Sequence, residues 1–305
     1  MLITVDHGNK QIKTGGGKVF TSGLRESDTK PPFGEDVLKH NGKYYTLSDR
    51  RIPYLREKFT DSRFYILTLF AIAFEIENTG TYVDGLMTVQ LAVGLPPAHY
   101  GAQFERFEEY FKSGTIEEFE FNGKTYRIFI DEVASYPQAF AAAMTVYGKI
   151  CGLPKLVVID IGAFTVDYLM IKSGQVDMSA CDSLEHGVIV LYNLISARVN
   201  SELDLLLEET DIDAILKGEP NDYGEDVKRI VDDTAQVFIS DLLGKLRERA
   251  IDLRSGKSVF IGGGSILLKE QIAASGKVAS PIFIDNIGAN AKGYEILHKA
   301  STARR

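Results

Sequence analysis

Apolar and polar residues follow one another along the chain in short runs that predict alternating strands and helices. A β-branched run, Leu2 to Val5, stops at a turn rich in Gly and Asn, which is typical of a strand that opens a hairpin. The apolar run from Phe64 to Phe74 is broken only by Thr68. Because a bilayer span needs roughly 20 apolar residues, this run predicts a buried helix over about Ser62 to Asn78. Asp61 or Ser62 is its predicted cap, and Gly80 is its predicted stop.

The remaining periodicity predicts a mixed α/β chain. Further helices are expected over residues 102–112, 137–146, 187–200, 224–254, 266–274 and 290–299, with another inside the acidic stretch 204–219. Strands are expected over residues 88–95, 118–121, 126–130, 156–160, 166–171, 259–261 and 282–284. In the helix over 102–112, the acidic side chains Glu105, Glu108 and Glu109 are predicted to form a solvent-exposed face.

One element occurs twice. A strand, an Asp, one spacer residue, a Gly and a turn are found at Asp6 and again at Asp160, 154 residues further on. A repeat at half the chain length predicts two domains of shared architecture. Gly152-Leu153-Pro154 is the predicted boundary, which gives a first domain over 1–153, completed by a C-terminal helix over about 288–305, and a second over 154–287.

Composition narrows the classes of function. Among 305 residues, 34 are Lys or Arg and 42 are Asp or Glu, which gives a net charge of −8. That balance argues against direct nucleic-acid binding through bulk positive charge. The two cysteines, Cys151 and Cys181, are too few for a disulfide framework. With no leader-like or membrane-binding segment in the sequence, a cytoplasmic protein with no membrane partner is expected.

The repeated Asp-x-Gly turns suit phosphate chemistry. A glycine at a hairpin tip lets backbone N–H groups approach a phosphate oxygen. Asp6 and Asp160, each at the end of a strand, are the predicted Mg²⁺ ligands, because Mg²⁺ takes carboxylate and phosphate oxygens together. Lys13 supplies a nearby positive charge. A third turn, Gly262-Gly263-Gly264-Ser265, leads from a strand into a helix N-terminus, which favours negative charge.

These features, in this order, resemble the actin and sugar-kinase ATPase superfamily. The segments that carry the resemblance are Asp6 to Lys13 (first phosphate loop), Gln138 to Gly148 (first connecting helix), Asp160 to Asp167 (second phosphate loop), Gly262 to Ser265 (adenosine motif) and Ala289 to Tyr294 (second connecting motif). The resemblance covers about residues 3 to 300. It implies an actin-like fold of two similar domains, with mixed sheets flanked by helices and a nucleotide cleft between them.

Within that superfamily the chain is most similar to bacterial actin-like ATPases of the ParM/StbA plasmid-segregation type, through Gly94-Leu95-Pro96 and Tyr136-Pro137-Gln138-Ala139. This resemblance implies filaments that bind ATP and Mg²⁺, hydrolyse ATP slowly, and reach plasmid DNA through a DNA-binding adaptor. It assigns the reaction to Gln138, Asp160 and Asp6. It assigns nucleotide binding to Gly8, Asn9, Lys10, Lys13, Gly162, Ala163, Thr165, Asp167, Gly262, Gly263, Gly264 and Ser265.

Several readings stay open at the level of sequence. A metabolic kinase of the superfamily, a chaperone-type ATPase and a cytoskeletal actin that segregates nothing are the alternatives, and ATP is not distinguished from GTP. Asp167 either faces the cleft or caps a turn. The run Glu225 to Arg229 is either a charge-paired surface or part of the adenosine site. His7 is predicted to face solvent, with a phosphate contact as the alternative. Gly15 to Gly17 is predicted to be a turn, because Lys18 lacks the P-loop pattern around it.

Overall fold

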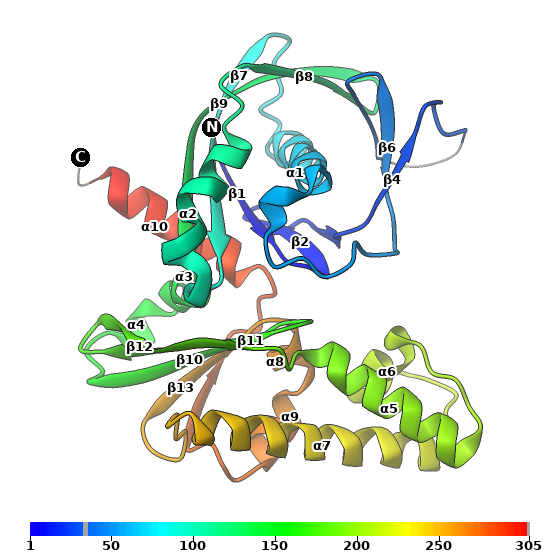
Figure 1. Cartoon of the computed structure of the whole chain (residues 1–305), viewed down its shortest axis with the longest axis vertical. Coiled ribbons are helices and arrows are strands. Elements are labelled where there is room, and N and C mark those ends of the chain that lie inside the picture. Colours follow the sequence, from blue (N-terminus) through cyan, green and yellow to red (C-terminus); the bar gives the residue numbers. More distant parts are fainter. Residues whose placement is uncertain (33–35, 304–305) are drawn as a thin grey trace. The chain divides into compact units, whose positions relative to one another are not determined.

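The computed structural model describes residues 1–32 and 36–303, and these form two compact units (Figure 1). The first unit contains Met1–Thr145 together with the chain from Gly288 on, and the second contains Val146–Ile287. Each unit is a mixed sheet with helices against it, so the α/β architecture predicted from the sequence is confirmed.

The first unit is built on a sheet that has nine strands within the described residues, in the order β3-β2-β1-β7-β9-β8-β5-β6-β4. The strands are β1 (Leu2–His7), β2 (Gln11–Thr14), β3 (Val19–Thr21), β4 (Leu24–Ser27), β5 (Val37–His40), β6 (Lys43–Leu47), β7 (Leu86–Leu95), β8 (Ile116–Phe121) and β9 (Lys124–Pro137). β1, β7 and β9 run parallel, and the flanking strands pair in antiparallel fashion. The parallel centre places the ends of β1 and β9 at the same edge of the sheet.

Helix α1 (Ser62–Thr79) is the core of this unit, and the sheet curves around it (Figure 1). Asp61 caps its first turn by accepting the N–H of Arg63, and Gly80 ends it with φ 64°. Nearly every apolar side chain from Phe64 to Ile76 is buried. The sequence prediction of a buried helix with these two ends is therefore confirmed.

The other helices of the first unit are the 3₁₀ turn η1 (Lys58–Thr60), α2 (Pro97–Phe111), α3 (Phe140–Met144) and α10 (Ala289–Thr302). The helix predicted over 102–112 starts earlier, because Pro97 fits the first turn of a helix. The prediction that Glu108 is solvated is wrong: its Oε1 accepts both the N–H and the hydroxyl of Ser135, at 2.8 and 2.6 Å. The helix predicted over 137–146 is shorter, because β9 still pairs with β7 at Pro137.

The second unit is built on a sheet with five strands within the described residues, in the order β12-β11-β10-β13-β14. Its elements are α4 (Tyr147–Ile150), β10 (Lys155–Ile161), β11 (Val166–Lys172), β12 (Gln175–Leu184), α5 (Val188–Leu203), α6 (Glu209–Leu216), α7 (Glu225–Glu248), β13 (Lys257–Ile261), α8 (Gly263–Leu267), α9 (Lys269–Ala274) and β14 (Ser280–Phe283). β10, β13 and β14 are parallel, whereas β11 and β12 are antiparallel. A second apolar core lies between this sheet and its helices.

Two predicted helices of this unit differ in extent. The helix expected over 224–254 ends at Glu248, because Ala250 takes φ 61° and the chain turns back to bury Ile251 and Leu253. The helix expected over 266–274 is two short helices, α8 and α9, separated at Leu268. Among the described residues both cysteines are free thiols, and none of the helices has the length and apolar character needed to cross a membrane.

Candidate functional site

The first Asp-x-Gly turn is the tip of the β1–β2 hairpin. In the antiparallel register Asp6 lies opposite Lys13, and the last pair before the turn is His7 with Ile12. Opposite residues place their side chains on the same face of the sheet. Lys13 Nζ accordingly lies 3.5 Å from Asp6 Oδ2. The seven-residue spacing between the Asp and the Lys is therefore a consequence of hairpin register.

The second Asp-x-Gly turn has the same register in the β10–β11 hairpin. Asp160 lies opposite Asp167, again seven residues on, and the last pair before the turn is Ile161 with Val166. Both aspartates are buried, and Asp167 Oδ2 accepts a hydrogen bond from Thr165 Oγ1 at 3.1 Å. The two hairpins thus share a backbone design but differ in charge, since one carries an Asp–Lys ion pair and the other carries two carboxylates.

Gln138 reaches the first hairpin from the end of β9. Its Nε2 donates to Asp6 Oδ1 at 2.8 Å, and its own N–H donates to the carbonyl of Leu95 on β7. Gln138 and Asp6 are 8% and 3% exposed. The first unit therefore gathers three of the predicted site residues, Asp6, Lys13 and Gln138, around one buried carboxylate.

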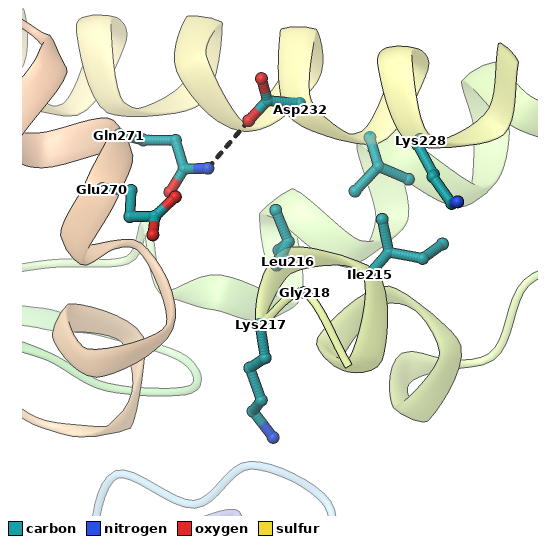
Figure 2. A pocket seen from close by; sticks show the side chains of 9 residues that line it. Ile215, Leu216, Lys217, Gly218, Lys228, Asp232, Glu270 and Gln271 are labelled. Carbon is teal, nitrogen blue, oxygen red and sulfur yellow. Dashed lines mark hydrogen bonds between the residues drawn. The ribbon is translucent and has the colours of Figure 1, made fainter. Parts of the chain in front are cut away.

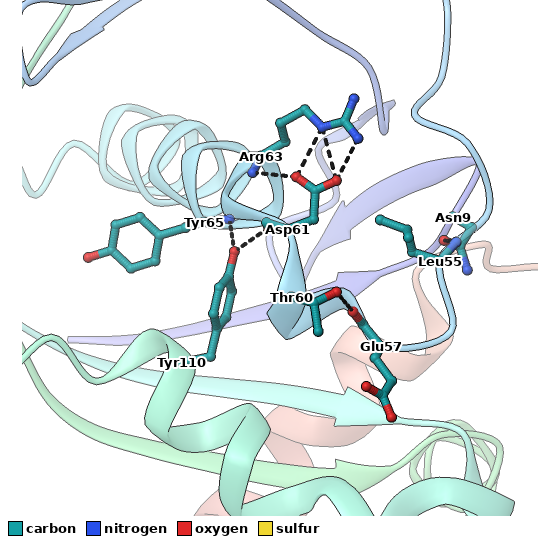
Figure 3. Close-up of polar contacts among 8 residues, drawn as sticks. All are labelled: Asn9, Leu55, Glu57, Thr60, Asp61, Arg63, Tyr65 and Tyr110. Atoms are coloured by element: carbon teal, nitrogen blue, oxygen red, sulfur yellow. Dashed lines mark hydrogen bonds and ion pairs between the residues drawn. The ribbon is translucent and has the colours of Figure 1, made fainter.

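The tip of the first hairpin is held by side chains outside it. Ser22 donates its hydroxyl to the carbonyl of Gly8 and its N–H to that of Lys10. A Cβ on Gly8 would lie 2.5 Å from the carbonyl oxygen of Gln11, so only glycine fits there. The Oδ1 of Asn9 accepts the N–H of Leu55, which lies beside it in Figure 3. In the Asn9 side chain, the Nδ2 group is then the one that can donate to a phosphate.

The tip of the second hairpin sits on the first turn of α5. Three α5 N–H groups donate to loop carbonyls, namely Val188 to Gly162, Ile189 to Ala163 and Gly187 to Phe164. Because C=O and N–H point to opposite sides of a trans peptide, the N–H groups of Ala163, Phe164 and Thr165 face away from α5. Consecutive N–H groups aimed the same way suit an anion such as phosphate.

Gly187 is a closely packed position of the second hairpin that the sequence did not single out. A Cβ there would lie 2.4 Å from the carbonyl oxygen of Ala163, so the loop and the helix touch backbone to backbone. In the sequence, Gly187 is only a glycine at the start of a predicted helix, and the same is true of Gly224. No local signal separates the two glycines, because the difference is the approach of a distant loop.

The glycine-rich turn Gly262–Gly264 lies beside Asp160, because β13 pairs with β10. Gly262 has φ 86°, and a Cβ on it would lie 2.3 Å from Asp160 Oδ1. A Cβ on Gly264 would lie 2.4 Å from Cγ2 of Ile161, whereas one on Gly263 would make only an ordinary contact. Ser265 is 1% exposed in the first turn of α8. Gly263 is therefore the one glycine of the turn with space above its backbone.

The second unit also contains a cavity of about 290 Å³ between the end of α6, α7 and α9 (Figure 2). Its lining combines apolar and charged side chains: Ile215, Leu216, Lys217, Gly218, Lys228, Val231, Asp232, Glu270 and Gln271. Gln271 Nε2 donates to Asp232 Oδ1 at 2.9 Å at one end of it. Lys228 belongs to the run Glu225–Arg229, which forms the ion pairs expected of a charge-paired face and also reaches this cavity.

The prediction that His7 faces solvent, or else a phosphate, is wrong. β1 includes His7, and side chains alternate along a strand, so this ring points away from Asp6 into the core. It is fully buried, stacks on Phe111 with ring centroids 4.9 Å apart, and lies 2.8 Å from Thr68 Oγ1 through Nε2. Burial, with a smaller contribution from the charge of Lys58, lowers its pKa to about 3.

Comparisons with known proteins agree with this architecture. The family model "Actin like proteins N terminal domain" matches residues 4–140, and the model "Archaeal actin homologue MreB-like, C-terminal" matches residues 158–274. The chain is an actin-like protein. A search of curated proteins gives no match.

Solved structures show the same fold at low identity. An archaeal actin homologue, Ta0583, in complex with ADP is 18% identical, with a TM-score of 0.75 over 98% of this chain and 99% of that one. A 15-stranded ParM filament from Clostridium botulinum is 18% identical, with a TM-score of 0.75 over 98% and 99%. ParM of Bacillus thuringiensis with AMPPNP is 14% identical, with a TM-score of 0.70 over 99% of each chain. These neighbours establish the actin-like fold of both units.

Proposed function

We propose that this actin-like protein binds ATP with Mg²⁺, assembles into filaments in the ATP state and hydrolyses the nucleotide slowly. The observation that carries this proposal is the pair of hairpins with identical register, one with Lys13 opposite Asp6 and one with Asp167 opposite Asp160. Each unit thereby offers backbone N–H groups at a hairpin tip, with charged side chains at the strand ends beneath. Known relatives of the same fold are described with ADP, with AMPPNP and as a filament.

The residues present fit a bound Mg²⁺. Asp160 and Asp167 supply hard carboxylate oxygens at the second hairpin, and Asp6 supplies them at the first. Among the described residues no group of three or more His, Cys, Asp or Glu side chains gathers into a protein-only metal site. That donor set suits a cation which keeps water and phosphate oxygens as its remaining ligands. Bound there, Mg²⁺ would neutralise developing phosphate charge.

The side chains around Asp6 support a water-positioning role for Gln138. Its Nε2 is engaged by Asp6, which fixes the amide plane and turns Oε1 toward the hydrogen of an attacking water. Lys13 is a point charge for the β- or γ-phosphate. Hydrolysis breaks the bond between the γ-phosphorus and the bridging oxygen, and yields ADP and phosphate. Because an amide is too weak a base to deprotonate water, Gln138 positions the water without activating it, and slow turnover follows.

The nucleoside end of ATP is assigned to the second unit. The turn at Gly263 admits a ribose or base against the backbone, and the cavity lined by Lys217, Lys228 and Glu270 has the size and mixed polarity of a small-molecule site. The charged side chains of Lys217, Lys228 and Glu270 can contact the hydroxyl groups of a ribose and the ring nitrogens of a base. Both features support binding of a purine nucleotide there.

The cellular role that we propose is segregation of plasmid DNA through a DNA-binding adaptor. The net charge of −8 is consistent with DNA contact through such a partner. A second candidate, a cytoskeletal filament that segregates nothing, is favoured by the match of residues 158–274 to an archaeal MreB-like domain. Loss of the gene should destabilise inheritance of a plasmid that carries it in the first case, and leave plasmid inheritance unchanged in the second.

Right-angle light scattering and phosphate release test the biochemical proposal. At micromolar protein, ATP and a non-hydrolysable analogue should give high-mass assemblies and ADP should not. Gln138→Ala should still assemble with ATP while phosphate release slows about tenfold or more. The exposed Gln175, replaced by Ala, is the matched control and should behave as wild type. Absence of assemblies with every nucleotide would refute filament formation, and unchanged phosphate release in Gln138→Ala would refute the assigned site.

A further inference from the structure

The backbone reverses sharply just after Gln138. Ala139 has φ 60° and ψ −54°, and the N–H of Phe140 donates to the carbonyl of Gln138 at 2.5 Å. This is a three-residue γ-turn with a positive central φ, a conformation that is rare and strained for a residue with a Cβ. Ala139 is fully buried. A strained turn persists only where its surroundings hold it, so something must fix this one.

Asn290 provides a contact that fixes the turn. Its Oδ1 accepts the N–H of Ala139 at 2.9 Å, although the two residues lie 151 positions apart in the sequence. Asn290 is in the first turn of α10 and is 8% exposed. A turn further along, a Cβ on Gly293 would lie 2.0 Å from the carbonyl oxygen of Ala141. α10 and α3 therefore approach backbone to backbone, and Asn290 is held at a fixed depth against the turn.

The peptide of Gln138 is consequently held from two sides. On one side its N–H donates to the carbonyl of Leu95 at 2.8 Å. On the other side the following N–H is engaged by Asn290. With both flanking peptides fixed, the Cα–Cβ bond of Gln138 has a fixed direction, and the side chain ends with Nε2 2.8 Å from Asp6 Oδ1.

We infer that Asn290 is a positioning residue: by holding the γ-turn at Ala139 it aims the Gln138 amide at Asp6, and so sets the rate of phosphate release rather than the affinity for nucleotide. The kinetic part of this inference rests on the proposed function of Gln138. Its structural part, that Asn290 controls the orientation of Gln138, does not. A role for Asn290 in α10 stability alone predicts different results in the following experiments.

The first experiment measures kcat and KM for ATP-dependent phosphate release in three single variants. Asn290→Leu keeps the size of the side chain and removes the acceptor oxygen, and it should lower kcat about tenfold with KM changed less than about twofold, because misplacement of a positioning group acts on the chemical step. Asn290→Asp keeps an acceptor oxygen and should recover kcat to within about threefold. His298→Leu is the control, since it also perturbs a buried polar contact of α10, to Tyr136, but leaves the Asn290 contact to Ala139 in place.

A double variant separates positioning from general destabilisation. If Asn290 acts through Gln138, Gln138→Ala with Asn290→Leu should be no slower than Gln138→Ala alone. The inference is overturned if Asn290→Leu slows the Gln138→Ala protein further by the full tenfold, if Asn290→Asp is as slow as Asn290→Leu, or if His298→Leu lowers kcat equally.

Hydrogen exchange of the Ala139 amide tests the structural part without nucleotide. Exchange should accelerate about tenfold or more in Asn290→Leu and remain slow in His298→Leu, and the side-chain amide signals of Gln138 should shift only in Asn290→Leu. Unchanged exchange in Asn290→Leu overturns the inference. If the wild type hydrolyses no ATP, or Gln138→Ala is as fast as wild type, the proposed function fails instead, and this exchange measurement still decides the role of Asn290.

Discussion

Lowering the pH from 7 to 5 should destabilise the first unit through one imidazole, that of His7. The ring is fully buried between α2 and α1, where it stacks on Phe111. The hydroxyl of Thr68 donates to the carbonyl of Phe64, so Nε2–H of His7 must donate to Thr68 Oγ1. The neutral ring then carries its proton on Nε2. A second proton would go on Nδ1, which has no hydrogen-bond partner among the described residues.

The size of the effect follows from the two pKa values. Burial lowers the pKa of His7 from 6.5 to about 3 in the folded protein. Because the pKa of His7 is lower in the folded protein, the unfolded chain binds a proton at a pH where the folded chain does not. The free energy of unfolding therefore decreases as the pH falls below 6.5 toward 3. Between pH 7 and pH 5 this linkage amounts to about 2 kcal/mol. The figure changes little if the folded pKa is nearer 4, since both values lie below the window.

Urea unfolding of the wild type and of His7→Phe at both pH values measures the effect. A phenyl ring fits the same aromatic site and does not titrate. The NMR signals of Val5 and Ile12 report the first unit by itself, which matters because the two units need not unfold together. The wild type should lose about 2 kcal/mol more than His7→Phe between pH 7 and pH 5. Equal losses in the two proteins, or an imidazole signal of His7 that titrates near pH 6.5, would refute the reasoning.

Two further predictions concern the tips of the hairpins. Gly187→Ala should push the carbonyl of Ala163 away, lower the affinity for ATP about tenfold and reduce the free energy of unfolding by about 1–3 kcal/mol. Gly224→Ala, in open space, should reduce the free energy of unfolding by only about 0.5–1 kcal/mol, through weaker capping, and leave the affinity unchanged. Nucleotide titration and urea unfolding measure the two effects. Asn9→Ala should reduce the free energy of unfolding in urea by about 1 kcal/mol, because the N–H of Leu55 loses its acceptor. Asn9→Asp keeps that oxygen and should reduce it less. Equal reductions in the two variants would contradict this account.

Local sequence determined those elements whose ends and faces are set by near neighbours. α1 begins at the Asp61 cap and ends at a glycine with positive φ, as its sequence predicts, because capping involves only residues within one turn. The strands predicted over 118–121 and 126–130 likewise lie within β8 and β9, which pair as a hairpin across Asn122-Gly123. The repeat of Asp-x-Gly at half the chain length identified the two hairpins that prove to share one register.

Only the tertiary structure decided what lies against those elements. Whether His7 ends a strand or opens a loop depends on the aromatic side chains of α2, about 100 residues away, and their burial made the solvent-exposed prediction wrong. The helix predicted from Pro137 onward is delayed because β9 keeps pairing with β7 and because Ala139 is held in a γ-turn by Asn290. Glycine spacing, likewise, does not separate Gly187 from Gly224. Periodicity and helix caps depend on residues close together in the chain, so the sequence determined the helices and strands. The contacts that orient Gln138 and hold the second hairpin join segments far apart in the sequence, and only the folded chain brings those segments together.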